Sequence, residues 1–269
     1  MNKIKKIFLL NLEKRKDKLD FMKFKLQDVN INDYEIVYGI DGTNDNESKQ
    51  LYRNYLNTLT QDDYVRKQTC IHKETVFAII KSFKKIFEKV LSYDNNDYIL
   101  IFEDDVIFHK NFDLNKIKIK TDIVYLGGNQ LKWGSKINKS YKLINDRKYI
   151  TYGLYAVIYK VKFIKDFYNF HLKDLTKIRK PLDYLIWEFI IKNNISNIVI
   201  FPNLVIPNLL NSDNMGSRNI KEFCKFKKWN LNNYRYMDLE LEYYDLYKNY
   251  DIKYIIDNYV TYHKNKKCL

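Results

Sequence analysis

Three consecutive carboxylates follow a short apolar run near the middle of the chain. The run 98–102 leads directly into Glu103, Asp104 and Asp105. Carboxylates at the end of a buried strand repel one another, and a bound cation removes that cost. Side chains two positions apart on an extended chain share a face, so we expect Glu103 and Asp105 to bind one divalent ion, Mn²⁺ or Mg²⁺. Asp104 then points elsewhere, for instance to a ribose hydroxyl. A solvated acidic loop is the simpler alternative.

The elements around these carboxylates alternate between strands and helices. Apolar runs predict strands at 4–12, 34–38, 98–102, 123–126, 151–159 and 198–201. Helical spacing of apolar residues predicts helices at 14–29, 74–91, 161–172 and 181–194. Such alternation is typical of an α/β fold with a mostly parallel sheet, whose ligand site lies outside the carboxyl ends of the strands. The three carboxylates follow such an end.

Length and composition indicate one main folding unit. The chain has 269 residues, 46% hydrophobic and 16% aromatic, which is enough for the core of an α/β domain. No Pro/Gly/Ser-rich linker interrupts residues 1–217, which we interpret as a catalytic domain. Residues 218–269 are rich in Lys, Tyr and Asn and have helical patterns near 239–250 and 252–262. We expect a helical C-terminal extension packed on or beside the domain.

The charge balance is strongly basic. Lys and Arg number 47 against 33 Asp and Glu, a net charge of +14. Such a field attracts nucleotide phosphates, polyanions or an anionic membrane surface, so peripheral membrane contact is one expectation. No basic helix, aromatic stacking motif or zinc module accompanies the charge. We therefore expect no sequence-specific binding of nucleic acid.

The N-terminal region and the cysteines bear on the compartment. The basic start at 1–6 precedes an apolar run, 7–10, that is too short for a signal peptide. No stretch approaches the roughly 18 apolar residues of a membrane span. Cys70, Cys224 and Cys268 have neither metal-ligand nor disulfide-framework spacing. We expect a soluble or peripheral protein in the reducing cytoplasm.

Five segments occur in the order found in a known enzyme family. They are Leu10-Asn11-Leu12 with Arg15, Tyr38-Gly39-Ile40-Asp41-Gly42, Phe102-Glu103-Asp104-Asp105-Val106, Pro181-Leu182-Asp183 and Asn211-Ser212-Asp213. With them the chain resembles glycosyltransferase family 25, the lipopolysaccharide-type and procollagen galactosyltransferases, over about residues 4–217. The resemblance implies a Rossmann-like nucleotide-sugar transferase fold of the GT-A type. It also implies a metal-dependent, inverting transfer of galactose or glucose from a UDP-sugar to a hydroxyl of a glycan or hydroxylated protein.

Two segments depart from the family pattern. The family's Gly-Cys-x-x-Ser-His segment is replaced by residues 67–72, in which only His72 remains. The family's Thr-His-Ala-Tyr strand is altered in residues 151–155. We therefore carry over the reaction class but not the sugar or acceptor specificity.

The resemblance assigns the other polar residues to the donor site. It places Asn11 and Arg15 near the uracil and ribose, where the Arg15 guanidinium reaches a phosphate. Asp41 and His72 become donor-site contacts, with an acceptor contact as the alternative for His72, and Asp213 closes over the diphosphate. The simpler interpretations are a cap and a solvated side chain for the first pair, a turn residue for Asp41, a structural role for His72 and a capping or turn residue for Asp213.

Asp183 is the candidate catalytic base. It follows Pro181 in the first turn of a predicted helix, where the helix dipole favours a carboxylate with or without a chemical role. An inverting transfer needs a group that takes the proton of the acceptor hydroxyl, and we assign that role to Asp183. Glu188 lies about 140° further around the helix, so we do not expect both carboxylates to face one cleft.

Two other functions remain open at the level of sequence. A metal-dependent phosphohydrolase would use the acidic cluster to hold ions that activate water. A non-catalytic module on a glycosyltransferase-like fold would use the basic surface to bind nucleic acid or an anionic surface.

Overall fold

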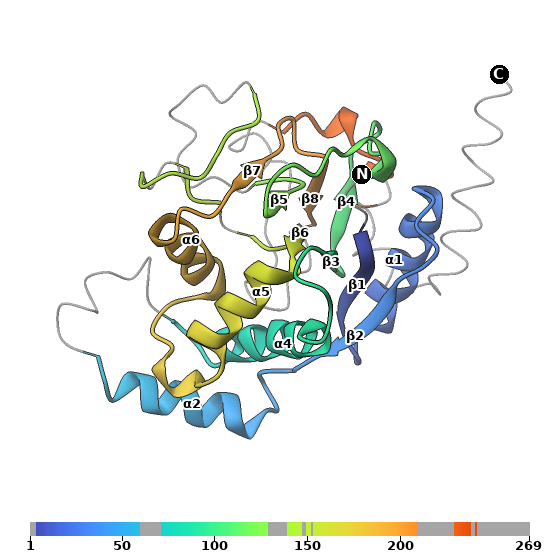
Figure 1. The fold of residues 1–269 in the computed structure, drawn as a ribbon. Helices are drawn as coiled ribbons and strands as arrows, with labels where there is room; N and C mark the ends of the chain where they lie inside the picture. The colour runs from blue at the N-terminus through green and yellow to red at the C-terminus, as the bar shows by residue number, and fades with distance from the viewer. Residues whose placement is uncertain are drawn as a thin grey trace, which may run out of the picture.

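A computed structural model of the chain describes residues 4–59, 71–128, 139–146, 149–151, 153–208, 229–237 and 240 (Figure 1). The strands are β1 (Ile4–Leu12), β2 (Glu35–Gly39), β3 (Tyr98–Glu103), β4 (Val106–Phe108), β5 (Ile123–Tyr125), β6 (Ala156–Lys160), β7 (Asn197–Val199) and β8 (Val205–Pro207). The α-helices are α1 (Lys16–Asp28), α2 (Asn46–Leu56), α4 (Thr75–Val90), α5 (Val161–Phe167) and α6 (Leu182–Lys192). A π-helical turn, η3 (Tyr168–Leu172), continues α5, and 3₁₀ turns lie at Leu114–Lys116, Leu175–Lys177 and Leu231–Asn233.

The central sheet has six strands in the order β2-β1-β3-β6-β5-β7. β1 is parallel to both β2 and β3, and β5 is parallel to β7. β6 runs antiparallel to its neighbours β3 and β5. The predicted α/β class with a mostly parallel sheet is confirmed. The carboxyl ends of β1, β2 and β3 meet at one edge, and the start of β6 lies at that same edge.

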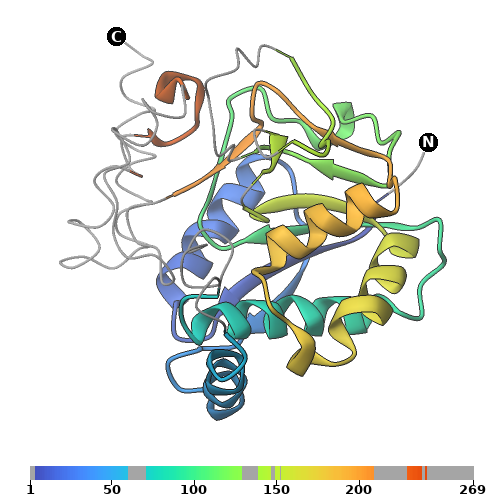
Figure 2. The ribbon, with the colours of Figure 1, turned by 90° about the vertical axis from the view of Figure 1, so that its left-hand side faces the viewer.

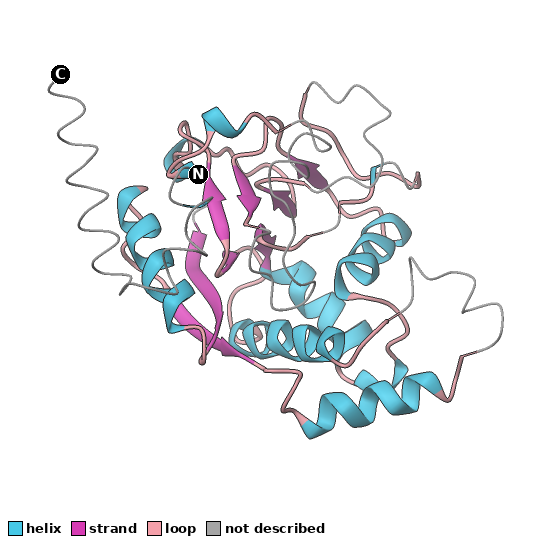
Figure 3. Cartoon of the chain, turned by 180° about the vertical axis from the view of Figure 1, so that it is seen from behind, coloured by secondary structure: helices cyan, strands magenta, loops and turns pink. Residues whose placement is uncertain are grey.

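Helices cover both faces of the sheet (Figure 3). α1 packs on one face through Leu19, Met22 and Leu26, which share a core with Leu9 and Leu100. α4, α5 and α6 pack on the other face, where their apolar side chains meet alternate residues of β3 and β6. Because strand side chains alternate between faces, these residues are buried on both sides, which explains the continuous apolar runs in the sequence.

The α4 sequence has the widest apolar stripe among the helices, which is why its predicted and observed bounds agree closely. α2 lies outside α4, away from the sheet, and contributes Leu51 and Tyr55 to the core (Figure 2). The sequence interpretation did not include α2, whose side chains are mainly polar. None of the described helices is long and apolar enough to cross a membrane.

Two other elements differ from expectation. The strand predicted at 151–159 begins only at Ala156, because Gly153 has a φ of +125°, which an extended strand does not allow. The helix predicted at 161–172 changes from α to π geometry after Phe167.

A second, two-stranded sheet lies beside the end of β3. It consists of β4 and β8, which run antiparallel with Val106 opposite Pro207. Gly127 makes room for it, since a Cβ at this position would lie 2.0 Å from the Val205 carbonyl oxygen. Tyr234, from the C-terminal region, packs on the same sheet. The helices predicted at 239–250 and 252–262 lie outside the described residues, apart from Glu240.

Candidate active site

The three carboxylates lie where β3 leaves the central sheet. Glu103 is the last residue of β3, Asp104 and Asp105 form the turn, and β4 begins at the next residue. The Glu103 amide donates to the Tyr155 carbonyl oxygen at 2.9 Å. On the other side of the turn, the Asp105 carbonyl oxygen accepts from the Asn208 amide at 2.6 Å. Backbone hydrogen bonds therefore hold the turn at both ends.

Glu103 lies among other acidic side chains. Burial, followed by the charges of Asp105 and Asp104, raises the pKa of the Glu103 carboxyl to about 8. Lys18 of α1 opposes this shift, and its Nζ lies 3.5 Å from Asp104 Oδ1. Within the described part of the chain, Glu103 itself forms no ion pair. Burial among other carboxylates therefore makes the ionised form of Glu103 costly.

The oxygen ligands fit a hard divalent ion only in part. Among the described residues, no group of three or more His, Cys, Asp or Glu side chains has the arrangement of a metal site. Mg²⁺ and similar ions commonly use one or two protein carboxylates and complete their shell with water and substrate phosphates. Glu103 and Asp105 match such a partial set, and burial among other carboxylates, which raises the pKa of Glu103, is a cost that a bound cation would remove.

Asp183 lies on the same face of the sheet as Glu103. Ile99 and Ile101 point into the core beneath α6, so Glu103, two residues on, faces that side as well. The charge of Asp183 contributes to the raised pKa of Glu103. It also raises the pKa of the Tyr125 hydroxyl, although burial is the larger cause. The structure therefore brings these two carboxylates, from β3 and α6, to one region.

The Asp183 carboxylate is held by the backbone. Its Oδ1 accepts from the Tyr184 amide at 2.9 Å, and the Gly153 amide also donates to it. Burial raises the pKa of Asp183 to about 6, while these backbone donors act in the opposite direction. In the described residues Asp183 has no ion pair. A carboxylate fixed in this way, with a pKa near neutrality, is suited to accept a proton.

Asn11 lies near the carboxyl end of β1 and Arg15 follows that strand, but their side chains have different partners. Asn11 is buried on β1, one residue beyond the position opposite Glu103. Its Nδ2 donates to the Leu12 carbonyl oxygen at 2.7 Å, and its Oδ1 is buried with no hydrogen-bond partner among the described residues. Arg15 instead forms a two-pronged ion pair with Asp17, with Nε–Oδ1 at 2.9 Å and Nη2–Oδ2 at 2.6 Å. Its guanidinium is already engaged by a carboxylate.

Asp41 occupies a turn after β2. Its Oδ1 accepts from the Thr43 amide at 3.1 Å, and its Oδ2 pairs with Lys14 Nζ at 2.6 Å. Burial alone would raise the pKa of Asp41, but the hydrogen bonds from Lys14 and Thr43 outweigh it and lower the pKa. Gly42 packs against α4, where a Cβ would lie 2.6 Å from Thr75 Cα. The local geometry thus accounts for Asp41 and Gly42 as turn residues.

His72 and Asp213 remain outside the group formed by Glu103 and Asp183. The His72 side chain is exposed, and its backbone carbonyl oxygen accepts from the Tyr52 hydroxyl at 2.9 Å. Partial burial and then Lys73 lower the pKa of His72. Asp213 lies outside the described residues.

Residues 4–175 match the sequence profile of glycosyltransferase family 25, which is described as an LPS biosynthesis protein. The match covers more than half of the chain. The chain belongs to glycosyltransferase family 25. The predicted family and the predicted enzyme class, a glycosyltransferase, are both confirmed. A search of the curated proteins found no match.

The extent of the family 25 match separates the candidate residues into two groups. It includes Asn11, Arg15, Asp41, His72 and the acidic triplet. It ends before α6, so Asp183 and Asp213 lie beyond it. The proposed role of Asp183 consequently rests on its position beside Glu103 and on its own surroundings.

Several polar residues around Glu103, Asp104 and Asp105, here called the acidic turn, were missed by the sequence interpretation of this family 25 protein. Lys18 and Lys25 were counted with the solvated face of α1, yet both are buried. Their spacing carried a signal, since positions 18, 22 and 25 lie on one side of a helix and Met22 belongs to the core. Gly153, whose amide holds Asp183, lies in the segment where the chain departs from the family pattern.

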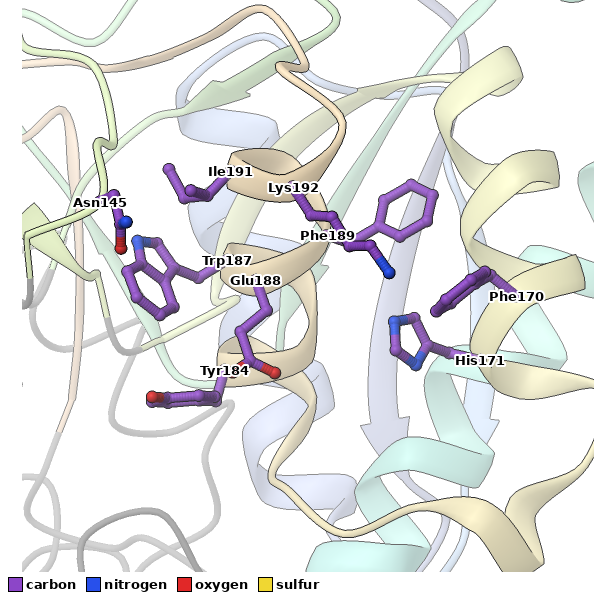
Figure 4. Close-up of a pocket in the computed structure, with 9 residues that line it drawn as sticks. All are labelled: Asn145, Phe170, His171, Tyr184, Trp187, Glu188, Phe189, Ile191 and Lys192. Carbon is purple, nitrogen blue, oxygen red and sulfur yellow. The ribbon is translucent and has the colours of Figure 1, made fainter.

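A pocket of about 610 Å³ lies on the outer side of α6 (Figure 4). Tyr184, Trp187 and Glu188 line one part, and Phe170 and His171 of η3 line another. Phe170 is 61% exposed and lies under Lys192 Nζ, which is 5.3 Å from the ring centroid. Glu188 pairs with Lys180. Asp183 does not line this pocket, although its neighbour Tyr184 does.

Proposed function

We propose that this family 25 protein transfers a hexose, galactose or glucose, from a UDP-sugar to a hydroxyl group of a glycan or a hydroxylated protein side chain. The transfer inverts the anomeric configuration and depends on Mn²⁺ or Mg²⁺. The fold is proposed to be of the GT-A type. The observation that carries the proposal is the cluster of carboxylates at the end of buried β3, where the pKa of Glu103 is raised to about 8.

Glu103 and Asp105 would hold the divalent ion together with the donor diphosphate. When bound, the ion supplies Lewis-acid stabilisation of the negative charge that develops on the leaving nucleotide. The two carboxylates are two positions apart on the chain and meet the preference of hard ions for oxygen. Lys18, 3.5 Å from Asp104, holds the middle carboxylate on the α1 side. That arrangement supports separate roles for Asp104 and its neighbours.

The donor nucleoside would lie across the carboxyl ends of β1 and β3. Asn11 supports this placement, because its buried Oδ1 has no partner in the described residues and would accept a hydrogen bond from a uracil N–H. Asp104 is proposed to accept from a ribose hydroxyl. Arg15 would reach a phosphate only by exchanging its ion pair with Asp17. Asp41, His72 and Asp213 are proposed as further donor-site residues.

Asp183 would act as the base on the acceptor side. It takes the proton of the acceptor hydroxyl as that oxygen attacks the anomeric carbon from the face opposite the leaving diphosphate. The pKa of about 6 leaves this carboxylate ionised at neutral pH, and the backbone donors fix its direction. The pocket beside Tyr184 is the proposed path for the rest of the acceptor, because its lining combines aromatic rings with polar side chains such as Asn145 and Glu188.

A donor screen tests the proposal. Purified protein would be incubated with Mn²⁺ and a panel of UDP-, GDP- and CMP-sugars, and nucleotide release would be measured with and without chelator. We expect release from a UDP-hexose that chelator abolishes. Release of inorganic phosphate from simple phosphate esters would instead support the phosphohydrolase. Metal-independent release, or release only from a GDP- or CMP-sugar, would contradict the proposal.

A further inference from the structure

A closed ring of hydrogen bonds lies directly behind the acidic turn. Glu240 Oε1 accepts from Lys25 Nζ at 2.9 Å, and Glu240 Oε2 accepts from Asn208 Nδ2 at 2.5 Å. Lys25 Nζ also donates to the Val106 carbonyl oxygen at 2.6 Å. The backbone N–H of Asn208 donates to the Asp105 carbonyl oxygen at 2.6 Å. Because Asp105 and Val106 are consecutive, the Glu240 carboxylate closes the ring through the backbone of the turn.

The side chains in this ring are almost fully buried. Glu240 is 1% exposed, Lys25 is 2% exposed and Asn208 is 8% exposed. A buried ion pair is a poor source of stability, since apolar residues of similar volume often serve as well or better. What a charged, hydrogen-bonded pair provides instead is one defined geometry. The geometry defined here is that of two consecutive carbonyl groups, those of the proposed ligand Asp105 and of Val106.

A second ion pair joins the same C-terminal region to α1 without entering the ring. Arg235 Nη1 lies 2.7 Å from Asp28 Oδ2, at the end of α1. The Arg235 amide donates to the Phe108 carbonyl oxygen at 2.8 Å, at the far end of β4. Loss of this pair would loosen the C-terminal region but leave the hydrogen bonds to the acidic turn in place. It therefore offers a matched control.

We infer that Glu240 is a positioning residue of this glycosyltransferase. Through Lys25 and Asn208 it fixes the backbone at 105–106, and thereby the direction in which Glu103 and Asp105 present their carboxylates to the ion. The inference rests on the proposed function for the role of those two carboxylates. It gives a role to residue 240, which lies far beyond the family match and which the sequence interpretation assigned to a tail without a chemical motif.

The test compares Glu240→Gln with the control Asp28→Asn. Hydrogen exchange of the amides at 103–108 would be measured in metal-free protein, and Mn²⁺ binding would be measured by electron paramagnetic resonance. For Glu240→Gln we expect faster exchange at 105–108 and an Mn²⁺ affinity about 10–100-fold weaker, the usual cost of losing support behind a metal ligand. At saturating Mn²⁺, kcat should recover towards the wild-type value. Asp28→Asn should change neither exchange at 105–108 nor Mn²⁺ affinity.

A second variant covers the case in which Glu240→Gln does not fold. The double change Lys25→Met with Glu240→Leu removes both buried charges, which favours a folded protein. A folded double variant with wild-type Mn²⁺ affinity and wild-type exchange at 105–108 would overturn the inference. Failure of the proposed function looks different: wild-type protein would then neither bind Mn²⁺ nor release nucleotide, while exchange at 105–108 in the variants would still report whether the ring holds the turn.

Discussion

On the α1 side of the acidic turn, buried carboxylates are paired with lysines. Lys18 lies 3.5 Å from Asp104, and Lys25 lies 2.9 Å from Glu240. Both lysines come from one side of α1, and both reach residues that are distant in sequence. These pairs neutralise charge within the protein, so they need no ligand to do so.

On the α6 side of the same turn, Glu103 and Asp183 have no ion pair among the described residues. Burial is the first cause of the raised pKa of each carboxyl group, and neighbouring carboxylates add to the shift at Glu103. The difference separates carboxylates that pair with lysines from two whose charge no lysine balances among the described residues. The unpaired ones are those expected to meet an ion or an acceptor hydroxyl.

The largest effect is expected when the proposed metal ligands are lost. Glu103→Gln with Asp105→Asn should abolish metal-dependent nucleotide release while the protein stays folded, because the changes remove charge and keep shape. Release and circular dichroism would be measured in parallel. Asp166→Asn, at a carboxylate on the surface of α5, is the control and should behave as wild type. Wild-type release from the double variant would remove the metal role from these residues.

Loss of the proposed base should have the next largest effect. Asp183→Asn should slow the chemical step by about 10²–10⁴-fold, the usual worth of general-base catalysis, with Mn²⁺ and nucleotide affinities nearly unchanged. In wild type, kcat should fall as the pH drops below about 6, because a protonated Asp183 cannot accept a proton. The variant should lack this acid limb. A lost nucleotide affinity would make Asp183 a donor-site residue instead.

Substitutions in the ion pairs of α1 should lower the free energy of unfolding. Lys25→Met leaves the Glu240 carboxylate buried without its cation, and breaking a buried pair typically costs about 3–5 kcal/mol. Asp28→Asn breaks the more exposed pair with Arg235, for which about 0–1 kcal/mol is typical. Urea unfolding of both variants measures the contrast. Equal losses would show that burial does not distinguish these two pairs.

The smallest effect concerns pH and the metal-free protein. The pKa of Glu103 is raised from 4.5 to about 8, so the folded state keeps a proton that the unfolded state releases. The folding stability of wild type should therefore decline as pH rises between about 4.5 and 8. Because Glu103→Gln lacks this titrating group, the difference in melting temperature between the variant and wild type should widen over that range. Asp104, Asp105, Asp183 and Lys18 surround the group in both proteins. A constant gap would contradict the assigned shift.

The parts of the fold that could be predicted are those specified by local patterns. The apolar runs of β1 and β3 and the stripe of α4 lie within the elements themselves, and their predicted bounds agree with the structure to within a residue or two. The antiparallel direction of β6 and the pairing of β4 with β8 could not be read in this way. Both depend on partners far along the chain. The sequence interpretation did not include α2, which has few apolar side chains.

The candidate site shows the same difference between local sequence patterns and contacts that are distant in sequence. Glu103, Asp104 and Asp105 were recognisable because three carboxylates follow an apolar strand in the sequence itself. The partners that distinguish them were not, since Lys18 lies 85 positions before Glu103 and reaches the turn only through the packing of α1. The contribution of Glu240 depends on a contact across 215 positions. Sequence patterns identify reactive groups more readily than the contacts that tune them.

The central claim is that Glu103 and Asp105, at the end of β3, bind a divalent ion together with the donor nucleotide. Titration of Mn²⁺ into wild type and into Glu103→Gln with Asp105→Asn, each with and without UDP, tests it most directly, with free Mn²⁺ followed by electron paramagnetic resonance. We predict that wild type binds one Mn²⁺ more tightly when UDP is present and that the double variant loses this binding. Equal Mn²⁺ binding by the two proteins in the presence of UDP would contradict the claim.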